Sequence, residues 1–352
     1  TSSSGNQPMY SNSKRYLIIF NGEIYNHLEI RNLINKKIKI FWKSNSDTET
    51  LINFIENFDI DYVLKNISGM FAFVVYDFKD DKLYLARDIA GEKPLYITAN
   101  EEYLAFSSDL KPFKNLNFYK KDINKYALKS YLKYNYVPAP ITIFENTFKV
   151  KSASLIDINL KKYNFKNIKS YQNILDDKHI NTKQWWVLKN IPKRKLEINN
   201  KNQIFDQIES LLEKSTKEQL ISDVPIGVFL SGGVDSSLIL SQIVKNKSNV
   251  DTFNIGFDFK EYDESEDANK IAKIFKTNHN HYVCNKNEAI SMIDKINDAF
   301  SEPFADSSQI PTMLVSQIAR KKVKVILGGD GGDEIFGGYN RYLLANKYWK
   351  YL

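Results

Sequence analysis

The apolar positions of the first half fall into short runs separated by polar turns, the spacing expected of strands. They predict strands at residues 15–21, 70–77, 82–88, 94–98 and 103–108. The polar run at 46–49 precedes Leu51, Ile55 and Phe58 at helical spacing, so this run is expected to cap a helix. Two more helices are expected, at 30–35 and 122–134. The pattern predicts a layered domain of mostly antiparallel strands.

The second half changes period, because apolar strands there alternate with amphipathic helices. After a helix that carries Ile204, Ile208, Leu211 and Leu212 on one face, the order is strand, helix, strand, helix, strand, helix, helix and strand. The expected ranges are 226–230, 236–244, 250–257, 265–276, 279–284, 287–300, 310–322 and 323–327. This alternation predicts right-handed crossovers and a doubly wound parallel sheet.

Residues 161–202 separate the two patterns, since they are rich in Lys, Asn and Asp and have weak periodicity. We therefore predict a first domain at 1–185, a linker at 186–202 and a second domain at 203–352. Trp185 and Trp186 stand at this boundary, and we interpret both as interdomain packing residues.

Composition limits the classes of protein that fit. The chain has 352 residues, 43% of them hydrophobic and 13% aromatic, which is enough for about two globular domains. No apolar run approaches the roughly 20 residues that cross a bilayer, and no signal peptide is recognisable, so we expect a cytoplasmic protein without a membrane partner. The net charge of +7 comes from scattered lysines, which favours solvated faces over nucleic-acid binding.

The single cysteine and the chain ends give two further expectations. Cys284 excludes an internal disulfide and is predicted to be a small core residue. The sequence starts at Thr1, and residues 339–352 have the pattern of the middle of a helix. Both ends are therefore expected to be cut.

The strongest chemical signal is the stretch between the strand at 226–230 and the following helix. Two glycines connect strand and helix, and the free N–H groups of the first helical turn form an anion site. Hydroxyl groups add donors, and an acidic side chain can hold the Mg²⁺ that accompanies a nucleotide. The residues are Ser231, Gly232, Gly233, Asp235, Ser236 and Ser237. A Walker loop is excluded because no lysine follows, and a Ser/Gly turn without a ligand is the structural alternative.

A second loop, at 328–334, holds four glycines and three acidic residues after an apolar strand. Because ligands bind beyond the carboxyl ends of parallel strands, both loops should leave the same edge of the sheet. We therefore expect Asp235 and Asp333 to face a common space and to share one Mg²⁺. A calcium turn is the alternative, but the ligand spacing of a calcium loop is not met.

In the first half, chemistry is expected at the end of the strand at 15–21. Asn21 brings a side-chain amide and Gly22 a backbone N–H, a suitable pair for an oxyanion hole. The carboxylate of Glu23 could hold an ammonium group. Asn-Gly is also a common turn and Asp47 a common helix cap, so a purely structural reading is at least as good from these residues alone.

Taken together, these motifs resemble two known families. The SGGxDSS loop at 231–237 resembles the loop with which ATP pyrophosphatases hold pyrophosphate. The order of motifs along nearly the whole chain is similar to the glutamine-hydrolysing asparagine synthetases. The matching stretches are 21–26, 68–73, 87–88, 91–96, 136–140 and 328–339. The resemblance implies an N-terminal-nucleophile domain, an αββα sandwich that is incomplete here, followed by an ATP-pyrophosphatase domain.

The resemblance also implies roles for single residues. Asn21 and Gly22 would stabilise the oxyanion, while Glu23 and Asp47 would hold the α-amino group of glutamine. Leu230 and Ile255 would lie at the adenosine, and Gly328 and Gly329 would contact ATP. Asp330 would take part in forming the acyl-adenylate. The implied reaction uses ATP, Mg²⁺, glutamine and aspartate, makes β-aspartyl-AMP and releases AMP and pyrophosphate, in a possible homo-oligomer.

The departures from the family leave two alternatives open. The family's N-terminal cysteine nucleophile and its glutamine-carboxylate arginine are absent from this stretch, so we expect no glutamine hydrolysis by the chain as given. Many family members have Glu where this chain has Asp330. One alternative is an amidotransferase acting on another carboxylate, such as a uronic acid in surface-polysaccharide synthesis. The other is a non-catalytic relic that holds glutamine or ATP.

Overall fold

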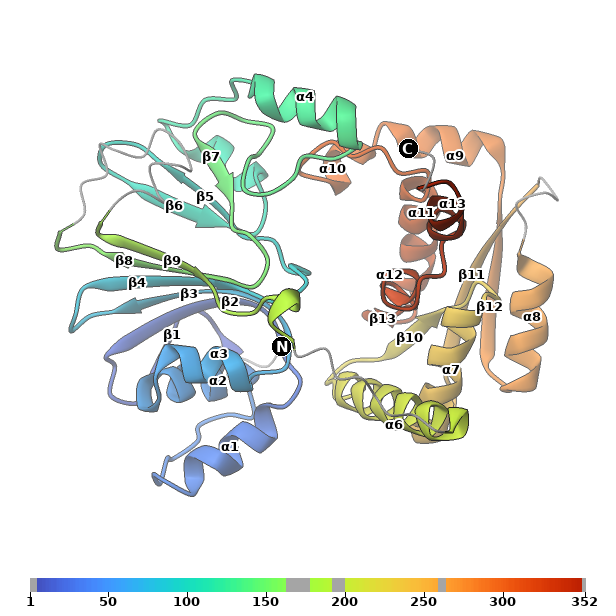
Figure 1. Cartoon of the computed structure of the whole chain (residues 1–352), viewed down its shortest axis with the longest axis horizontal. Helices are drawn as coiled ribbons and strands as arrows, with labels where there is room; N and C mark the ends of the chain where they lie inside the picture. The colour runs from blue at the N-terminus through green and yellow to red at the C-terminus, as the bar shows by residue number, and fades with distance from the viewer. Residues whose placement is uncertain (1–4, 163–177, 192–199, 259–263, 350–352) are drawn as a thin grey trace. The chain divides into compact units, whose positions relative to one another are not determined.

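A computed structural model describes residues 5–162, 178–191, 200–258 and 264–349. The chain divides into two units (Figure 1). Unit 1 is Thr1–Lys195 together with Phe300–Asp306, and unit 2 is Leu196–Ala299 together with Ser307–Leu352. The sequence did not predict that Phe300–Asp306, which comes from the second half of the chain, would belong to unit 1. Residues 192–199, within the predicted linker, lie outside the described residues.

The larger sheet of unit 1 has six strands, and all its pairings are antiparallel. Its strands, in spatial order, are β1 (Met9–Tyr10), β2 (Tyr16–Ile24), β3 (Gly69–Asp77), β4 (Lys82–Arg87), β8 (Ser154–Asn159) and β9 (Ile180–Gln184). One face packs on helices α1 (His27–Asn35), α2 (Asp47–Asn57) and α3 (Ile60–Asn66), with Ile18, Phe54 and Leu64 at most 1% exposed. Burial of this apolar face drives the docking of the helices.

The smaller sheet of unit 1 covers the other face. Its three strands are β6 (Leu104–Ser107), β5 (Tyr96–Ala99) and β7 (Thr147–Lys149), all antiparallel. Val74 and Leu85 of the large sheet pack with Ile97 and Phe148 of the small one. Helix α4 (Lys125–Tyr134) lies on the far side, where Ala127 is buried beside Tyr96 (Figure 1). The layers are helices, sheet, sheet and helix, which confirms the predicted αββα sandwich.

Unit 2 contains a sheet of four parallel strands. The spatial order is β12 (Asn278–Cys284), β11 (Asp251–Phe257), β10 (Ile226–Phe229) and β13 (Val325–Leu327). Val228 packs with helices α7 (Val234–Asn246) and α8 (Ser265–Ile274), whereas its neighbour Phe229 packs with α11 (Gln309–Ala319). Successive strand residues face opposite sides, so helices cover both faces and the doubly wound prediction is confirmed.

The remaining helices of unit 2 are largely exposed. Helix α6 (Lys201–Gln219) forms as predicted, but Leu211 is 68% exposed. The helix predicted at 287–300 is two helices, α9 (Lys286–Ile293) and α10 (Ile296–Ala299). After β13 come α12 (Gly332–Phe336) and α13 (Asn340–Tyr348). Cys284 is 1% exposed in an apolar cluster, which confirms its prediction as a core residue, and burial raises the pKa of its thiol.

Two predictions about unit 1 need correction. Strand β2 continues to Ile24, so Asn21, Gly22 and Glu23 lie inside the strand rather than after it. Trp185 is not an interdomain residue: its ring stacks on Phe71 at 6.1 Å, and its Nε1 donates to the Arg87 carbonyl at 3.2 Å. The aromatic ring therefore completes the core of unit 1.

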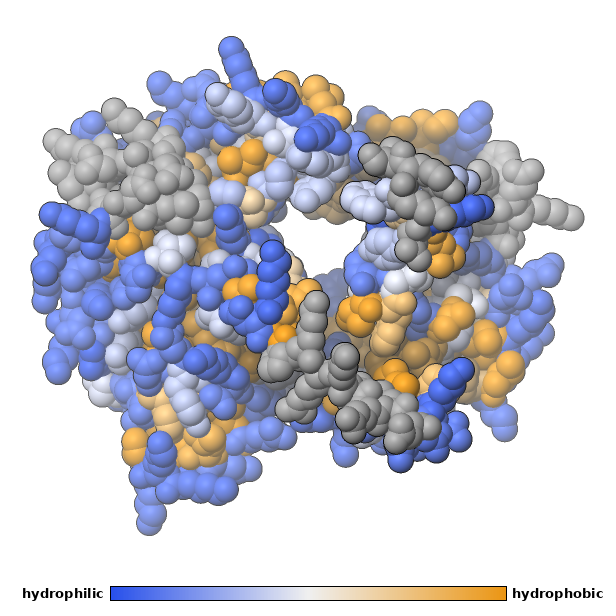
Figure 2. Space-filling view, in the orientation of Figure 1, coloured by the Kyte–Doolittle hydropathy of each residue, from blue (hydrophilic) through white to orange (hydrophobic). Residues whose placement is uncertain are grey.

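The surface of unit 1 is mostly hydrophilic in the view of Figure 2, with hydrophobic side chains exposed over α4. Leu132 of that helix is 75% exposed. Among the described residues, no helix has both the length and the apolar character that a membrane span requires.

Candidate nucleotide and glutamine sites

The loop between β10 and α7 is held by its own serine side chains. The hydroxyls of Ser231 and Ser236 lie 3.0 Å apart, and Ser231 Oγ accepts a hydrogen bond from the N–H of Gly233 at 3.2 Å. Ser236 Oγ donates to the Gly233 carbonyl at 3.2 Å. These contacts fix the loop without using the first helical N–H groups. Helix α7 starts at Gly233 as its N-cap, with no side chain bonded to its first turn.

One polar atom in this first turn has no partner among the described residues. Ser237 Oγ is buried, and no described group hydrogen-bonds to it. A buried hydroxyl without a partner costs about 1–3 kcal/mol, which a ligand oxygen would offset. The helix dipole favours an anion at the same place. Exposed residues surround this point, because Ser231 and Gly233 are exposed and Val234 is 81% exposed. A phosphate group therefore fits this loop.

The sequence predicts Gly232 as part of a phosphate-binding loop. In the structure, a glycine is also required at this position by packing against α8. Its φ is +84°, and a Cβ there would lie 2.6 Å from the backbone N of Ala268 in α8. Gly233 differs, because a Cβ there would meet only Ser231 Oγ, at 3.3 Å. The two adjacent glycines are thus not equivalent: the first seats the loop on α8, and the second lies at the exposed start of α7.

The second predicted loop leaves the sheet beside the first. Strands β10 and β13 are parallel neighbours, with Val228 opposite Leu327, so the loops that follow them emerge at the same edge. A Cβ on Gly329 would lie 2.9 Å from the Cβ of Asp235 and 3.1 Å from the Ser236 N. The prediction that both loops share one edge is confirmed.

The acidic residues of the two loops lie around glycines. A Cβ on Gly332 would lie 2.5 Å from Oδ2 of Asp235, so the absence of that Cβ leaves space in front of the carboxylate. The exposed Asp330 lies over Gly328, where a Cβ would be 3.1 Å from its Oδ2. Among the described residues, no three His, Cys, Asp or Glu side chains are placed to hold a metal by themselves. Asp235 with phosphate oxygens offers oxygen ligands that suit Mg²⁺, and Asp333 stays a predicted ligand.

The predicted adenosine residues do not form one surface with their side chains. Leu230 is 1% exposed and packs with the α7–α8 cluster, whereas Ile255 packs with the clusters that contain α11 and α9. Asn254, which the sequence analysis missed, donates from Nδ2 to the Leu230 carbonyl at 3.0 Å, and its Oδ1 lies 2.9 Å from His281 Nδ1. A polar residue inside an apolar strand was the available signal. Asn254 ties β11 to the start of the nucleotide loop.

In unit 1, the predicted oxyanion residues occupy the end of β2. Asn21 is exposed, and its Nδ2 donates to Ser108 Oγ at 3.0 Å, which orients the amide. Nothing in the sequence indicated Ser108, because it lies 87 residues away. Gly22 has a second reason to be glycine: a Cβ there would lie 2.1 Å from the Met70 carbonyl oxygen on β3.

The two predicted glutamine carboxylates have different surroundings. Asp47 Oδ2 accepts a hydrogen bond from the Ile24 N–H at 2.9 Å, and its Oδ1 accepts from the Thr48 N–H at 2.7 Å. Asp47 therefore joins the start of α2 to the end of β2, while the capping side chain of that helix is Ser46. Glu23 is exposed on β2. The structure brings Asn21, Gly22, Glu23 and Asp47 to one end of one strand.

The loop after β4 is held by two buried charged residues. Asp88 is 1% exposed, and its carboxylate accepts hydrogen bonds from four backbone N–H groups at 2.5–3.1 Å, those of Phe71, Gly91, Glu92 and Lys93. Arg87 donates to three carbonyls at 2.6–2.7 Å, those of Gly91, Lys93 and Val150. Burial lowers the pKa of Arg87, an effect opposed by the charge of Asp88. Both side chains therefore bond to the protein backbone, which indicates a structural role for this loop.

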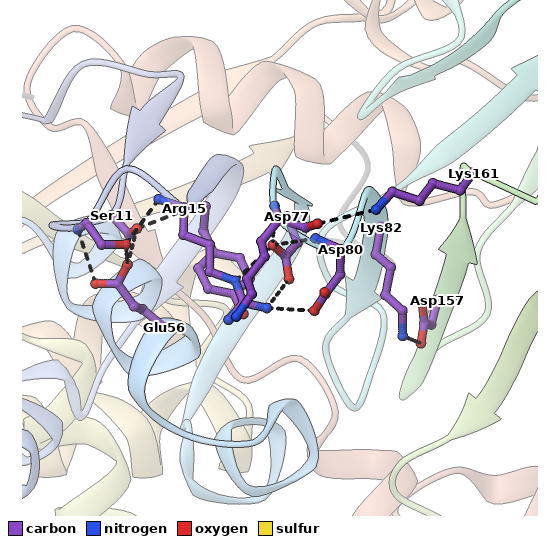
Figure 3. A network of polar contacts seen from close by, with 11 residues as sticks. Ser11, Arg15, Glu56, Asp77, Asp80, Lys82, Asp157 and Lys161 are labelled. Atoms are coloured by element: carbon purple, nitrogen blue, oxygen red, sulfur yellow. Dashed lines mark hydrogen bonds and ion pairs between the residues drawn. The ribbon is translucent and has the colours of Figure 1, made fainter.

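A further charged network joins the start of β2 to the end of β3 (Figure 3). Arg15 donates to both oxygens of the buried Asp77 at 2.9 and 2.6 Å, and to Asp80 at 2.7 Å. Burial acts to raise the pKa of Asp77, but the hydrogen bonds from Arg15 and from two backbone N–H groups outweigh it, so the pKa lies below its ordinary value. The satisfied geometry indicates a structural network rather than a site.

Two family models match the chain, one in each half. The family model described as "Glutamine amidotransferase domain" matches residues 1–172, and the model described as "Asparagine synthase" matches 207–352. A putative glutamine-hydrolysing asparagine synthetase 2 of Methanocaldococcus jannaschii is 35% identical over 332 residues, which are 93% of this chain and 59% of the relative. Glutamine-hydrolysing asparagine synthetase 1 of Bacillus subtilis is 33% identical over 346 residues, covering 96% of this chain and 50% of the relative.

The chain thus spans between half and three fifths of the length of these relatives. Among solved structures, a glutamine phosphoribosylpyrophosphate amidotransferase from B. subtilis is 14% identical. It covers 69% of this chain and 47% of its own, with a TM-score of 0.36, too low to establish a shared fold.

Proposed function

We propose that the chain is part of a glutamine-hydrolysing asparagine synthetase and that the whole protein makes asparagine, because two family models together match most of the chain and its relatives carry that name. In the proposed reaction, the side-chain carboxylate of aspartate attacks the α-phosphorus of ATP, and pyrophosphate leaves. Ammonia released from glutamine in unit 1 then attacks the acyl carbon and displaces AMP. The reaction requires a pyrophosphate site beside an acceptor site in unit 2 and an amide-hydrolysing site in unit 1.

One observation carries the proposal: two loops from neighbouring parallel strands meet at one edge of the sheet in unit 2. The loop at 231–237 offers Ser237 Oγ, which has no partner in the part of the chain that the structure describes, and a helix start without a side-chain cap. The loop at 328–334 brings Asp330, which is exposed, beside it. A phosphate donor set and an acidic residue at one sheet edge are what carboxylate activation by ATP needs.

Roles in unit 2 follow from what each group can donate. The N–H groups at the start of α7, with Ser231 and Ser237, would bind the leaving pyrophosphate and stabilise its developing charge. Asp235 and Asp333 would hold Mg²⁺, which supplies positive charge next to phosphate oxygens. Gly328 and Gly329 would contact the nucleotide, and Asp330 would act on the acceptor side. Leu230 and Ile255 would border the adenosine, Leu230 through its backbone because its side chain is in the core.

Roles in unit 1 follow from the end of β2. The amide of Asn21, oriented by Ser108, and the N–H of Gly22 would stabilise the oxyanion of the tetrahedral intermediate. Glu23 and Asp47 would hold the α-amino group of glutamine. We place the protein in the cytoplasm, where its small-molecule substrates are found, and a homo-oligomer stays a prediction.

The test is acceptor-dependent pyrophosphate release by the complete gene product. With Mg·ATP and ammonia, aspartate should give pyrophosphate and asparagine in equal amounts, and Asp330→Ala should abolish both products while Mg·ATP still binds. Release with a uronic acid but not with aspartate would replace the proposed acceptor. Binding of Mg·ATP without pyrophosphate release from any carboxylate would identify a binding relic instead.

A further inference from the structure

A short segment of the second half of the sequence is built into unit 1. The chain runs through α10 in unit 2, passes through Phe300–Asp306 in unit 1, and returns to unit 2 before α11. With the earlier passage near Lys195, the chain therefore crosses between the units three times. We call Phe300–Asp306 the returning segment. A short stretch placed in this way needs strong contacts, because ordering its backbone costs conformational entropy at every residue.

The centre of these contacts is the carboxylate of Glu302, whose side chain is 9% exposed. It forms an ion pair with Nζ of Lys149 on β7, which is itself 16% exposed. Its Oε1 accepts a hydrogen bond from the Ile143 N–H at 3.0 Å, and its Oε2 accepts one from the Tyr96 hydroxyl at 3.3 Å. Burial and the charge of Glu302 both raise the pKa of Tyr96. Each carboxylate oxygen thus has a partner in unit 1.

Backbone and aromatic contacts continue on both sides of Glu302. The Ala305 N–H donates to the Asn135 carbonyl at 2.7 Å, and Phe304 forms an antiparallel bridge with Tyr136. Phe300 and Phe304 pack edge to face at 4.7 Å between ring centres. The returning segment is therefore held along its length, not at one point.

The energetic balance makes Glu302 the decisive residue. A buried charge is strongly unfavourable unless it is paired and hydrogen-bonded, and removing one member of such a pair leaves the other charge uncompensated. A residue chosen only to fill space would be apolar. A buried carboxylate with fixed partners instead selects one register and one position for the segment, which is the specific contribution of buried ion pairs.

The returning segment leads directly into unit 2, because α11 begins three residues after the segment ends. Val315 and Ala319 of this helix pack against Phe253 of β11. The same strand carries Ile255 and Asn254, and Asn254 bonds to the carbonyl of Leu230 at the start of the nucleotide loop. Glu302 is thus connected to the nucleotide loop by a covalent segment, one helix and one strand.

We propose that Glu302 is a positioning residue. By anchoring the returning segment, it couples the release of ammonia in unit 1 to the use of that ammonia in unit 2. The coupling part of this inference rests on the proposed function. The anchoring part rests only on the contacts of unit 1. Glu302 touches no reacting group in this scheme: it acts by holding the returning segment and the start of α11.

Two substitutions test the anchor in the 352-residue chain by amide hydrogen exchange. Glu302→Gln keeps the shape but removes the charge, and Lys149→Met removes the partner. Both should speed exchange in residues 300–312 by about tenfold or more, while β3 and α7 stay unchanged. The double variant should be no worse than either single variant, because both remove the same ion pair. Asp157→Asn is the matched control, since it breaks the Lys82–Asp157 pair of unit 1, with N and O 3.4 Å apart. Unchanged exchange in 300–312, or an equal effect of the control, would overturn the anchor.

Coupling is tested with the complete gene product by comparing two nitrogen sources. In Glu302→Gln, asparagine made from glutamine should fall about fivefold or more relative to asparagine made from ammonia, and more glutamate should be released per asparagine. A merely structural role would lower both reactions together, and an unchanged ratio would overturn the coupling. A wild-type protein that makes no asparagine from ammonia would overturn the proposed function instead, and the exchange result would still decide the anchor.

Discussion

The loop after β4 in unit 1 and the two loops of unit 2 are held in opposite ways. In unit 1, buried charges do the holding: Asp88 binds four N–H groups, and Arg87 binds three carbonyls. In unit 2, close contacts of glycines act together with two serine hydroxyls: Gly232 lies against α8, Gly329 and Gly332 lie against Asp235, and Ser231 and Ser236 bond within their loop. The loop after β4 uses its charged groups for its own hydrogen bonds. The two loops of unit 2 keep polar groups that a ligand could contact.

The difference shows which loop can bind a ligand. A carboxylate whose oxygens already accept four hydrogen bonds has little capacity left for a substrate. Close backbone packing through glycines uses no polar side chain, so the N–H groups at the start of α7 stay available, and Ser237 Oγ has no partner among the described residues. In this protein, the loop that is rich in buried charged residues is therefore expected to have a structural role. The loops that are rich in glycine are expected to bind ligands.

The largest expected effect is in unit 1. Asp88→Ala should destabilise unit 1 by about 4 kcal/mol, since it leaves several buried N–H groups and the buried Arg87 without a partner. Denaturant unfolding followed by near-ultraviolet circular dichroism would measure it. Asp157→Asn, at a half-exposed pair, is the control and should cost under about 1 kcal/mol. A loss of Mg·ATP affinity with unchanged stability in Asp88→Ala would break the comparison.

A pH series sharpens the same point at the Arg15–Asp77 network. The pKa of Asp77 is lowered by folding, so its contribution is complete above the ordinary carboxyl value near pH 4 and is lost as the pH falls through the lower folded value. Asp77→Asn should cost about 2–3 kcal/mol at pH 7, with Arg15 one-third exposed, and the difference from wild type should shrink toward pH 2. Urea unfolding at pH 7, 4 and 2.5 measures this. A difference that stays constant across the series would contradict the ionised pair.

In unit 2, the adjacent glycines provide a matched pair. Gly232→Ala places a Cβ 2.6 Å from the α8 backbone at a positive φ, so the loop must move and Mg·ATP should bind about tenfold or more weakly. Gly233→Ala meets only Ser231 Oγ at 3.3 Å and should change the affinity by less than about threefold. Calorimetric titration of both variants gives the ratio. Equal losses in the two variants would show that flexibility, not contact with α8, matters at this loop.

The smallest effect is expected at Ser237. Ser237→Ala should weaken Mg·ATP binding about fivefold, the value of one ordinary hydrogen bond of about 1 kcal/mol, and should leave the unfolding free energy of the ligand-free chain unchanged or slightly higher. Stability holds because the hydroxyl has no partner among the described residues. Parallel titration and thermal unfolding measure both quantities. A variant that is less stable but binds normally would assign this hydroxyl a structural role.

Much of the fold could be read from the sequence, because it depends on periodicity. The hairpin of β3 and β4, the cap of α2 at Ser46 and the order of strands and helices in unit 2 follow from residues close together in the chain. The predictions were wrong where the conformation depends on residues that are distant in the sequence. β2 runs through Asn21 and Gly22 because β3 pairs with it to Gly69, and Trp185 enters the core of unit 1 because Phe71 lies there to stack on it.

For the candidate sites, residue types and their spacing predict the chemical groups: two glycine loops in unit 2, the Asn21–Glu23 stretch in unit 1 and a parallel sheet that brings the two loops to one edge. Which of these groups are packed, buried, oriented or left exposed depends on the tertiary structure. It packs Gly232 on α8, puts Leu230 in the core, orients Asn21 with Ser108 and places Glu302 in unit 1. Hydrogen-bond satisfaction and close contact depend on residues 24 to 206 positions away, and local patterns do not encode such distant partners.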